Sequence, residues 1–301
     1  MENEFSVSIV GTGITAVKAI DIITNRDNNI FRYYLVNNRP DSSKSLTLHK
    51  PYMSFKEKGT DNNNTVYFNH IEEIRDTINK ITDASVVILV LALGDGSAHE
   101  MTTYLAKCSR KNKALTICMA AMPFDFEDYI KTKQAQQELT ALEKYTDLVI
   151  TVDFAASIPP ECCMSDMVTY NESLRYFSNT IESVITMLRT DIICGIDFKE
   201  FKAIIEEGTR ANACNRIINR ADLYESDIWF NFPYDRDMIS RLNAGTVLLN
   251  ITGGYELTNS DVKTILFRIN RLIAKGKLKL SILPDGSYEE RIRIGLIFIE
   301  N

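Results

Sequence analysis

The sequence predicts an α/β fold with a doubly wound parallel sheet, a long central helix and a smaller α+β domain after it. An unbroken apolar run from Val86 to Leu93 indicates a strand that is buried on both faces. Apolar strand patterns alternate with helical patterns through the first half of the chain, which favours parallel strands with helices on both faces of the sheet. Pro159 and Pro160 then break the pattern, and a different arrangement follows.

The first half of the chain supplies the elements of the parallel sheet. We expect strands at residues 6–10, 32–36, 65–68, 86–93, 114–119 and 147–152. We expect helices at residues 15–24, 71–81, 97–110 and 127–144. Residues 41–64 are polar and rich in Asn and Lys, so this segment is predicted to be a loop.

The second half begins with the long helix, predicted over residues 166–189. Its apolar residues share one face at helical spacing: Leu174, Phe177, Ile181, Val184 and Leu188. Further helices are expected at 197–207 and 260–274, and strands at 245–250, 278–283 and 291–299. A Pro-Asp-Gly turn joins the last two strands, so we expect them to pair antiparallel.

Composition and charge exclude several classes of protein. The chain has 301 residues and a net charge of -6, which argues against a dedicated nucleic-acid binder. No apolar run approaches the ~20 residues of a membrane-spanning helix, and the first residues show no signal-peptide pattern. Its 6 cysteines show no CxxC spacing, so we expect reduced thiols in a cytoplasmic protein and no metal site.

Two glycine turns follow predicted strands that end at the same edge of the sheet. The first lies in residues 10–16 and the second in residues 94–97. Glycines let a backbone approach a phosphate, and each turn precedes a helix N-terminus with free N–H groups. Tight turns without a ligand remain an alternative. A dinucleotide-dependent oxidoreductase is another, although Asn37 and Asn38 stand where an acidic residue is expected to bind a ribose.

Two polar pairs lie at the starts of predicted helices. Asn171 and Glu172 could contact a base edge, or could simply be residues of a helix first turn, where acidic charge is favourable. Asp197 and Glu200 are three residues apart and share a helix face. They could order a water or a cation, or they could form a helix cap.

Taken in order, these segments resemble the FtsZ family of the tubulin superfamily over nearly the whole chain. Residues 93–99 lie where the family's GGGTGTG signature belongs, and residues 195–200 fall on its synergy loop, NxDxxD. Residues 114–127 are similar to the family's ALT…KPFSFE segment, and residues 248–258 match its VNITGG…LT segment.

The resemblance implies a GTP- or GDP-binding protein, with Mg²⁺ as a possible cofactor. The implied nucleotide-binding residues are Gly11, Thr12, Gly13, Gly94, Asp95, Gly96, Ser97, Glu138, Met167 and Asn171. Asp197 and Glu200 would act in catalysis by orienting the attacking water in a neighbouring subunit. The implied domains are a GTPase-like domain (1–165), a connecting helix (166–190) and a C-terminal activation-type domain (191–301).

The sequence departs from the family pattern at several positions, and these departures should slow GTP hydrolysis. Asp95 and Glu100 add negative charge to the second loop, and Glu200 replaces an aspartate with a side chain about one methylene longer. We therefore expect head-to-tail protofilaments with slow or absent hydrolysis. The alternative is a pseudoenzyme that serves as an assembly or regulatory module.

The expected partners follow from the same resemblance. They are a second copy of the chain or another FtsZ/tubulin-like protein, with no nucleic acid and no direct membrane insertion. The family's division proteins carry a flexible tail, and this sequence ends at Asn301, so we expect an accessory or specialised filament role rather than that of the main cell division ring protein.

Overall fold

The computed structural model describes residues 5–24, 31–36, 75–94, 97–124, 127–154, 166–189, 193–225, 245–273 and 277–300. The chain divides into two compact units, Met1–Ser178 and Asn179–Asn301. The loop predicted at 41–64, the strand predicted at 65–68 and the start of the helix predicted at 71–81 lie outside the described residues.

Parallel strands form the sheet of the first unit, in the order β2-β1-β3-β4-β5. They are β1 (Val7–Thr12), β2 (Arg32–Val36), β3 (Val86–Ala92), β4 (Leu115–Met122) and β5 (Leu148–Asp153). All side chains of β1 are buried, and so are those of β3 from Val86 to Leu91. The predicted parallel sheet with a doubly covered central strand is therefore confirmed.

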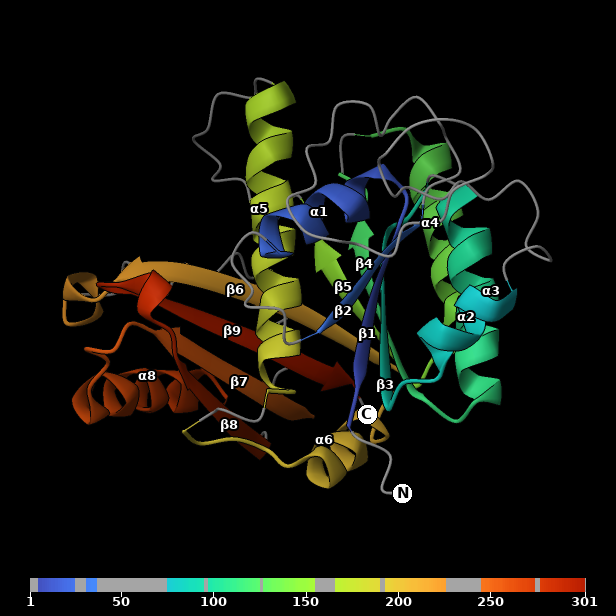
Figure 1. Ribbon diagram of the computed structural model, residues 1–301. Coiled ribbons are helices and arrows are strands. Elements are labelled where there is room, and N and C mark those ends of the chain that lie inside the picture. Colours follow the sequence, from blue (N-terminus) through green and yellow to red (C-terminus); the bar gives the residue numbers. More distant parts are fainter. Residues whose placement is uncertain are drawn as a thin grey trace, which may run out of the picture. The chain divides into compact units, whose positions relative to one another are not determined.

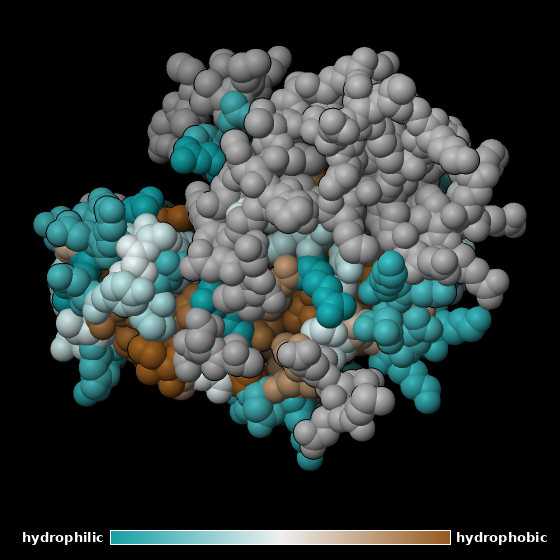
Figure 2. All heavy atoms as spheres, viewed as in Figure 1, coloured by the Kyte–Doolittle hydropathy of each residue, from teal (hydrophilic) through white to brown (hydrophobic). Residues whose placement is uncertain are grey.

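Helices cover both sides of this sheet (Figure 1). The first unit contains α1 (Ile14–Thr24), α2 (Arg75–Thr82), α3 (Ser97–Lys111), α4 (Tyr129–Leu142) and the first part of α5 (Asp166–Thr186). Figure 1 shows α2, α3 and α4 together on one side of the strands and α1 on the other, as right-handed crossovers require. Figure 2 shows hydrophilic residues on the outer surface of α2 and α3, which is typical of amphipathic surface helices.

The second unit is built on a mixed sheet in the order β6-β9-β7-β8. Its elements after α5 are α6 (Phe198–Ile205), β6 (Arg210–Asn219), the 3-10 turn η4 (Ala221–Leu223), β7 (Thr246–Gly253), α8 (Asn259–Leu272), β8 (Lys277–Pro284), the 3-10 turn η6 (Gly286–Tyr288) and β9 (Arg291–Glu300). β9 pairs antiparallel with β6 and with β7, whereas β7 and β8 are parallel and α8 forms their crossover.

The predicted antiparallel pairing of the last two strands is wrong, because β7 lies between β8 and β9. Every side chain of β7 is buried, so this strand takes the central place. The turn after β8 instead passes over the end of β7, where the Asp285 N–H donates to the Gly253 carbonyl at 2.8 Å. A Cβ on Gly254 would lie 2.0 Å from the Glu289 carbonyl oxygen, so only glycine leaves room for this crossing.

Strand β6 was not among the elements predicted from the sequence. Its first half, Arg210 to Asn215, consists of small and polar residues, and its β-branched residues come only at Ile217 and Ile218. Such a segment lacks the β-branched and aromatic enrichment that identifies strands. Pairing with β9 along all ten residues fixes it as a strand.

A buried arginine joins α5 to the sheet of the second unit. The Arg293 side chain is fully buried, and its Nη1 lies 2.6 Å from Oε2 of Glu182 on α5. Its Nη2 donates to the hydroxyl oxygens of Thr186 at 3.1 Å and Thr252 at 3.0 Å. Removing one partner of such a buried pair costs about 3–5 kcal/mol, because the other charge is left buried without a partner.

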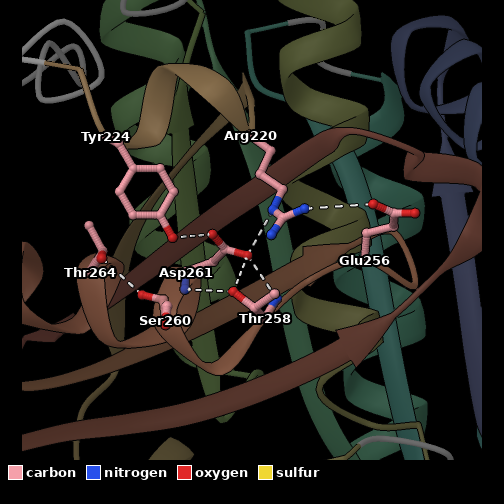
Figure 3. Close-up of polar contacts among 7 residues, drawn as sticks. All are labelled: Arg220, Tyr224, Glu256, Thr258, Ser260, Asp261 and Thr264. Atoms are coloured by element: carbon pink, nitrogen blue, oxygen red, sulfur yellow. Dashed lines mark hydrogen bonds and ion pairs between the residues drawn. The ribbon is translucent and has the colours of Figure 1, made fainter.

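A second polar cluster anchors the N-terminus of α8 (Figure 3). The Asp261 carboxylate has no exposed surface; it accepts the Thr258 N–H at 2.7 Å and the Arg220 Nε–H at 2.9 Å, and it contacts the Tyr224 hydroxyl. Burial raises the pKa of Asp261, but the hydrogen bonds from Tyr224, Thr258 and Arg220 outweigh it and hold the pKa below its ordinary value. The same hydrogen bond to Asp261 raises the pKa of Tyr224.

Candidate functional site

Two glycine turns lie at the carboxyl ends of neighbouring parallel strands in the first unit. β1 and β3 pair in register, with Thr12 opposite Leu91, and Gly13 and Gly94 follow the two strands. Both glycines have positive φ, +82° for Gly13 and +87° for Gly94, a conformation that other residues rarely adopt. A helix follows each turn, so the N-termini of α1 and α3 start at the same edge of the sheet.

The first turn is tightly packed against its surroundings. The Gly13 N–H donates to the Val36 carbonyl at 3.0 Å. A Cβ on Gly11 would lie 2.6 Å from Cδ1 of Ile20, and one on Gly13 would lie 3.0 Å from Cβ of Ala98 at the start of α3. The two turns are therefore close together in space, as their common sheet edge predicts.

The Thr12 side chain points into the unit. Its Oγ1 lies 2.5 Å from Oγ1 of Thr102 and donates to the Val90 carbonyl at 3.3 Å, and Thr12 is only 1% exposed. Any contact of Thr12 with a nucleotide would therefore involve its backbone.

A buried carboxylate holds the second turn. The Gly94 N–H donates to Oε2 of Glu138 at 2.7 Å, and the Gln134 side-chain amide donates to Oε1 at 2.9 Å. Glu138 is 5% exposed, so a charge-assisted hydrogen bond fixes the turn from within the unit. Glu138 was predicted as a nucleotide-binding residue, and the structure places both of its oxygens in these internal contacts.

Lys131 and Glu127 also lie beside the second turn, and neither was a predicted site residue. A Cβ on Gly94 would be 2.6 Å from Cγ of Lys131, and Lys131 Nζ lies 2.5 Å from Oε2 of Glu127. The sequence does contain a signal for this pair: opposite charges at (i, i+4) spacing, directly after a strand that ends at the same sheet edge.

The start of α5 is attached to α1. The Tyr170 hydroxyl lies 3.3 Å from Oγ1 of Thr15, and Lys18 Nζ lies 5.2 Å from the Tyr170 ring centre, within cation–π range. The next residue, Asn171, is exposed on α5. Asp95 and Gly96 lie outside the described residues, and so do the side chains of Ser97 and Met167, although their backbones belong to α3 and α5.

The two predicted catalytic carboxylates lie at the start of α6 in the second unit. The capping interpretation of Asp197 is confirmed: its Oδ1 accepts the Glu200 N–H at 2.7 Å. The Glu200 carboxylate forms an ion pair with Lys279 on β8. Both groups are partly exposed and are engaged within their own unit; their part in catalysis stays a prediction.

The described residues contain no group of three or more His, Cys, Asp or Glu side chains that could hold a metal ion. Cys108, Cys118, Cys194 and Cys214 are free thiols, and burial raises the pKa of the Cys118 thiol. None of the helices that the structure describes has the length and apolar character needed to span a membrane.

Comparison with known proteins identifies the class. Residues 18–158 match the family model "Tubulin/FtsZ family, GTPase domain". The cell division protein FtsZ of Buchnera aphidicola subsp. Baizongia pistaciae is 20% identical over 273 residues, which are 88% of this chain and 71% of that protein. Against three further FtsZ proteins the matched part spans only 37% to 49% of the relative's length.

Solved structures of the superfamily share the fold. An empty FtsZ dimer of M. jannaschii superposes with a TM-score of 0.80 at 18% identity, covering 100% of this chain and 89% of that one. The GTPγS-bound protofilament of CetZ2 from Haloferax volcanii gives a TM-score of 0.68 at 13% identity, covering 98% of this chain and 92% of that one. The family-model match and the FtsZ relatives support an FtsZ/tubulin superfamily member, and the solved structures share its fold.

Proposed function

We propose that this protein binds GTP, assembles head to tail into protofilaments and hydrolyses GTP slowly at the contact between subunits. The observation that carries the proposal is the pair of positive-φ glycine turns, Gly13 and Gly94, at the ends of adjacent parallel strands. Each turn leads into a helix N-terminus, and together they offer backbone N–H groups and two positive dipole ends to one polyphosphate.

The base end of the nucleotide would lie near the start of α5. Asn171 is exposed there, and its amide can both donate to and accept from the edge of a guanine. Mg²⁺ would be held mainly by the phosphates, which supply the oxygen ligands that this ion prefers. The ion would also offset the negative charge of Asp95 and Glu100.

Self-assembly is supported by the structural relatives. One of them is an FtsZ dimer and another is a CetZ2 protofilament with bound GTPγS. A head-to-tail contact uses two different surfaces of the same chain, and it produces an open filament when the rotation between subunits does not close a ring. In this arrangement Asp197 and Glu200 of one subunit would orient water at the nucleotide of the next. A second FtsZ/tubulin-like protein could replace one of the copies.

A pseudoenzyme of the same fold is the second candidate. Two observations favour it: Asp197 caps α6 and Glu200 pairs with Lys279, so both carboxylates already have partners in their own unit. A protein of this kind would assemble or regulate without turnover, and nucleotide would bind weakly or not at all.

Nucleotide titration of the purified protein tests the proposal. We expect GTP and GTPγS to bind, and we expect Asp95→Gly to tighten triphosphate binding about fivefold, because one unit charge at 4 Å in water contributes about 1 kcal/mol. Asp83→Gly is the matched control, since Asp83 is exposed at the opposite end of β3 and its loss should not change the affinity. Absence of binding in both wild type and Asp95→Gly would favour the pseudoenzyme.

A further inference from the structure

Lys279 contacts the carboxylate that the proposed reaction requires. It lies on β8 of the second unit, and its ammonium group forms a hydrogen-bonded ion pair with Oε1 of Glu200 on α6. The two side chains are 40% and 41% exposed, so the pair is partly open to solvent.

The segment that precedes Glu200 is attached to the same strand. The Ile193 N–H donates to the Ile282 carbonyl at 3.0 Å, and the Ile282 N–H donates to the Cys194 carbonyl at 2.7 Å. Asp197 then caps α6 and fixes where the helix begins. Two backbone hydrogen bonds therefore hold the start of the segment on β8. At the end of the segment, the side-chain ion pair with Lys279 holds Glu200 on this strand, and an ion pair of side chains is easier to break.

We propose that Lys279 is a positioning residue that holds Glu200 against β8 and so limits the rate of GTP hydrolysis. The inference rests on the proposed function, in which Glu200 acts on the nucleotide of a neighbouring subunit. A carboxylate orients water through its charge and its free lone pairs, and an ammonium group at hydrogen-bond distance reduces both. Glu200 must leave Lys279 before it can act in the next subunit.

The expected effect is moderate because the pair is partly exposed. Exposed Lys–Glu pairs change an equilibrium by about fivefold or less. Lys279→Met removes the charge and keeps much of the side-chain length. We expect this variant to raise kcat for GTP about two- to fivefold, with KM and GTP affinity unchanged. Lys279→Arg keeps the charge and should retain the wild-type rate.

Two controls separate this effect from a general loss of charge. Lys277→Met changes the same residue type two positions earlier on β8; Lys277 is 76% exposed and its Nζ lies 3.9 Å from the nearest oxygen of Glu207, so its loss should leave kcat unchanged. In the double variant Lys279→Met/Glu200→Gln the gain should disappear, because Lys279 acts through Glu200. Lys279→Gln gives a second neutral variant if Lys279→Met folds poorly in circular dichroism.

The outcomes distinguish the inference from the proposed function. Wild-type protein that binds no GTP in the titration overturns both. Protein that binds and hydrolyses GTP, while Lys279→Met and Lys279→Gln stay at or below the wild-type rate, overturns the inference alone. A gain that persists without the Glu200 carboxylate also overturns it.

Discussion

At the scale of single residues, the shape of the candidate nucleotide site depends on residues that contact the second glycine turn from inside the first unit. Glu138 accepts the Gly94 N–H from within the unit, and Lys131 packs over the same glycine. Gly94 has positive φ, which glycine adopts without strain, and a side chain at this position would also meet Lys131. These residues set the shape of the turn that would receive a phosphate.

Glu138→Ala tests this dependence. It leaves the Gly94 N–H without its buried acceptor, so we expect the free energy of unfolding to fall by about 1–3 kcal/mol. The relaxed turn should also bind GTP more weakly. Urea denaturation and nucleotide titration measure the two effects. Gln137→Ala, at an exposed position next to it on α4, is the control and should change neither quantity. Unchanged stability and affinity in Glu138→Ala would show that the turn holds its shape without the carboxylate.

At the scale of elements, the Asp261 cluster decides where α8 begins. Thr258 and Asp261 form a reciprocal capping box, and Arg220 and Tyr224 approach the same carboxylate from the segment after β6 (Figure 3). The capping box satisfies N–H groups at the helix start, while the two other contacts link α8 to a segment that is distant in sequence.

This cluster should make stability depend on pH. Hydrogen bonds hold the folded-state pKa of Asp261 below its unfolded value, so its contribution is complete above the ordinary aspartate pKa of about 3.9 and is lost as pH falls through the lower folded value. In Asp261→Asn this contribution is absent. The difference in unfolding free energy between wild type and Asp261→Asn should thus be largest at neutral pH and shrink below pH 4. Denaturation at several pH values measures it, and a constant difference would contradict the assigned role.

The sequence predicted local features better than distant pairings. The strand at 86–93, the glycine turn after it and the Asp197 cap depend on neighbouring residues and were predictable. The place of β7 between β8 and β9 was not, because a turn suggests pairing of its flanking strands and carries no information about a third strand. The contact of Glu138 with Gly94 joins residues 44 positions apart, and no pattern in the sequence indicates it.

At the scale of the whole molecule, one chain carries two surfaces with complementary roles in the proposed assembly. The first unit holds the glycine turns of β1 and β3, and the second unit holds the α6 segment with Asp197 and Glu200. Because these surfaces differ, each subunit added to an open filament leaves the same two surfaces free at the ends, so the filament can keep growing. If the nucleotide lies at the contact between subunits, assembly should depend on whether GTP is bound there.

Sedimentation of the purified chain at tens of micromolar, with GTP, with GDP and without nucleotide, tests this central claim most directly. We predict fast-sedimenting polymers with GTP, and mainly monomers or short oligomers in the other two conditions. A monomer in all three conditions would contradict the account.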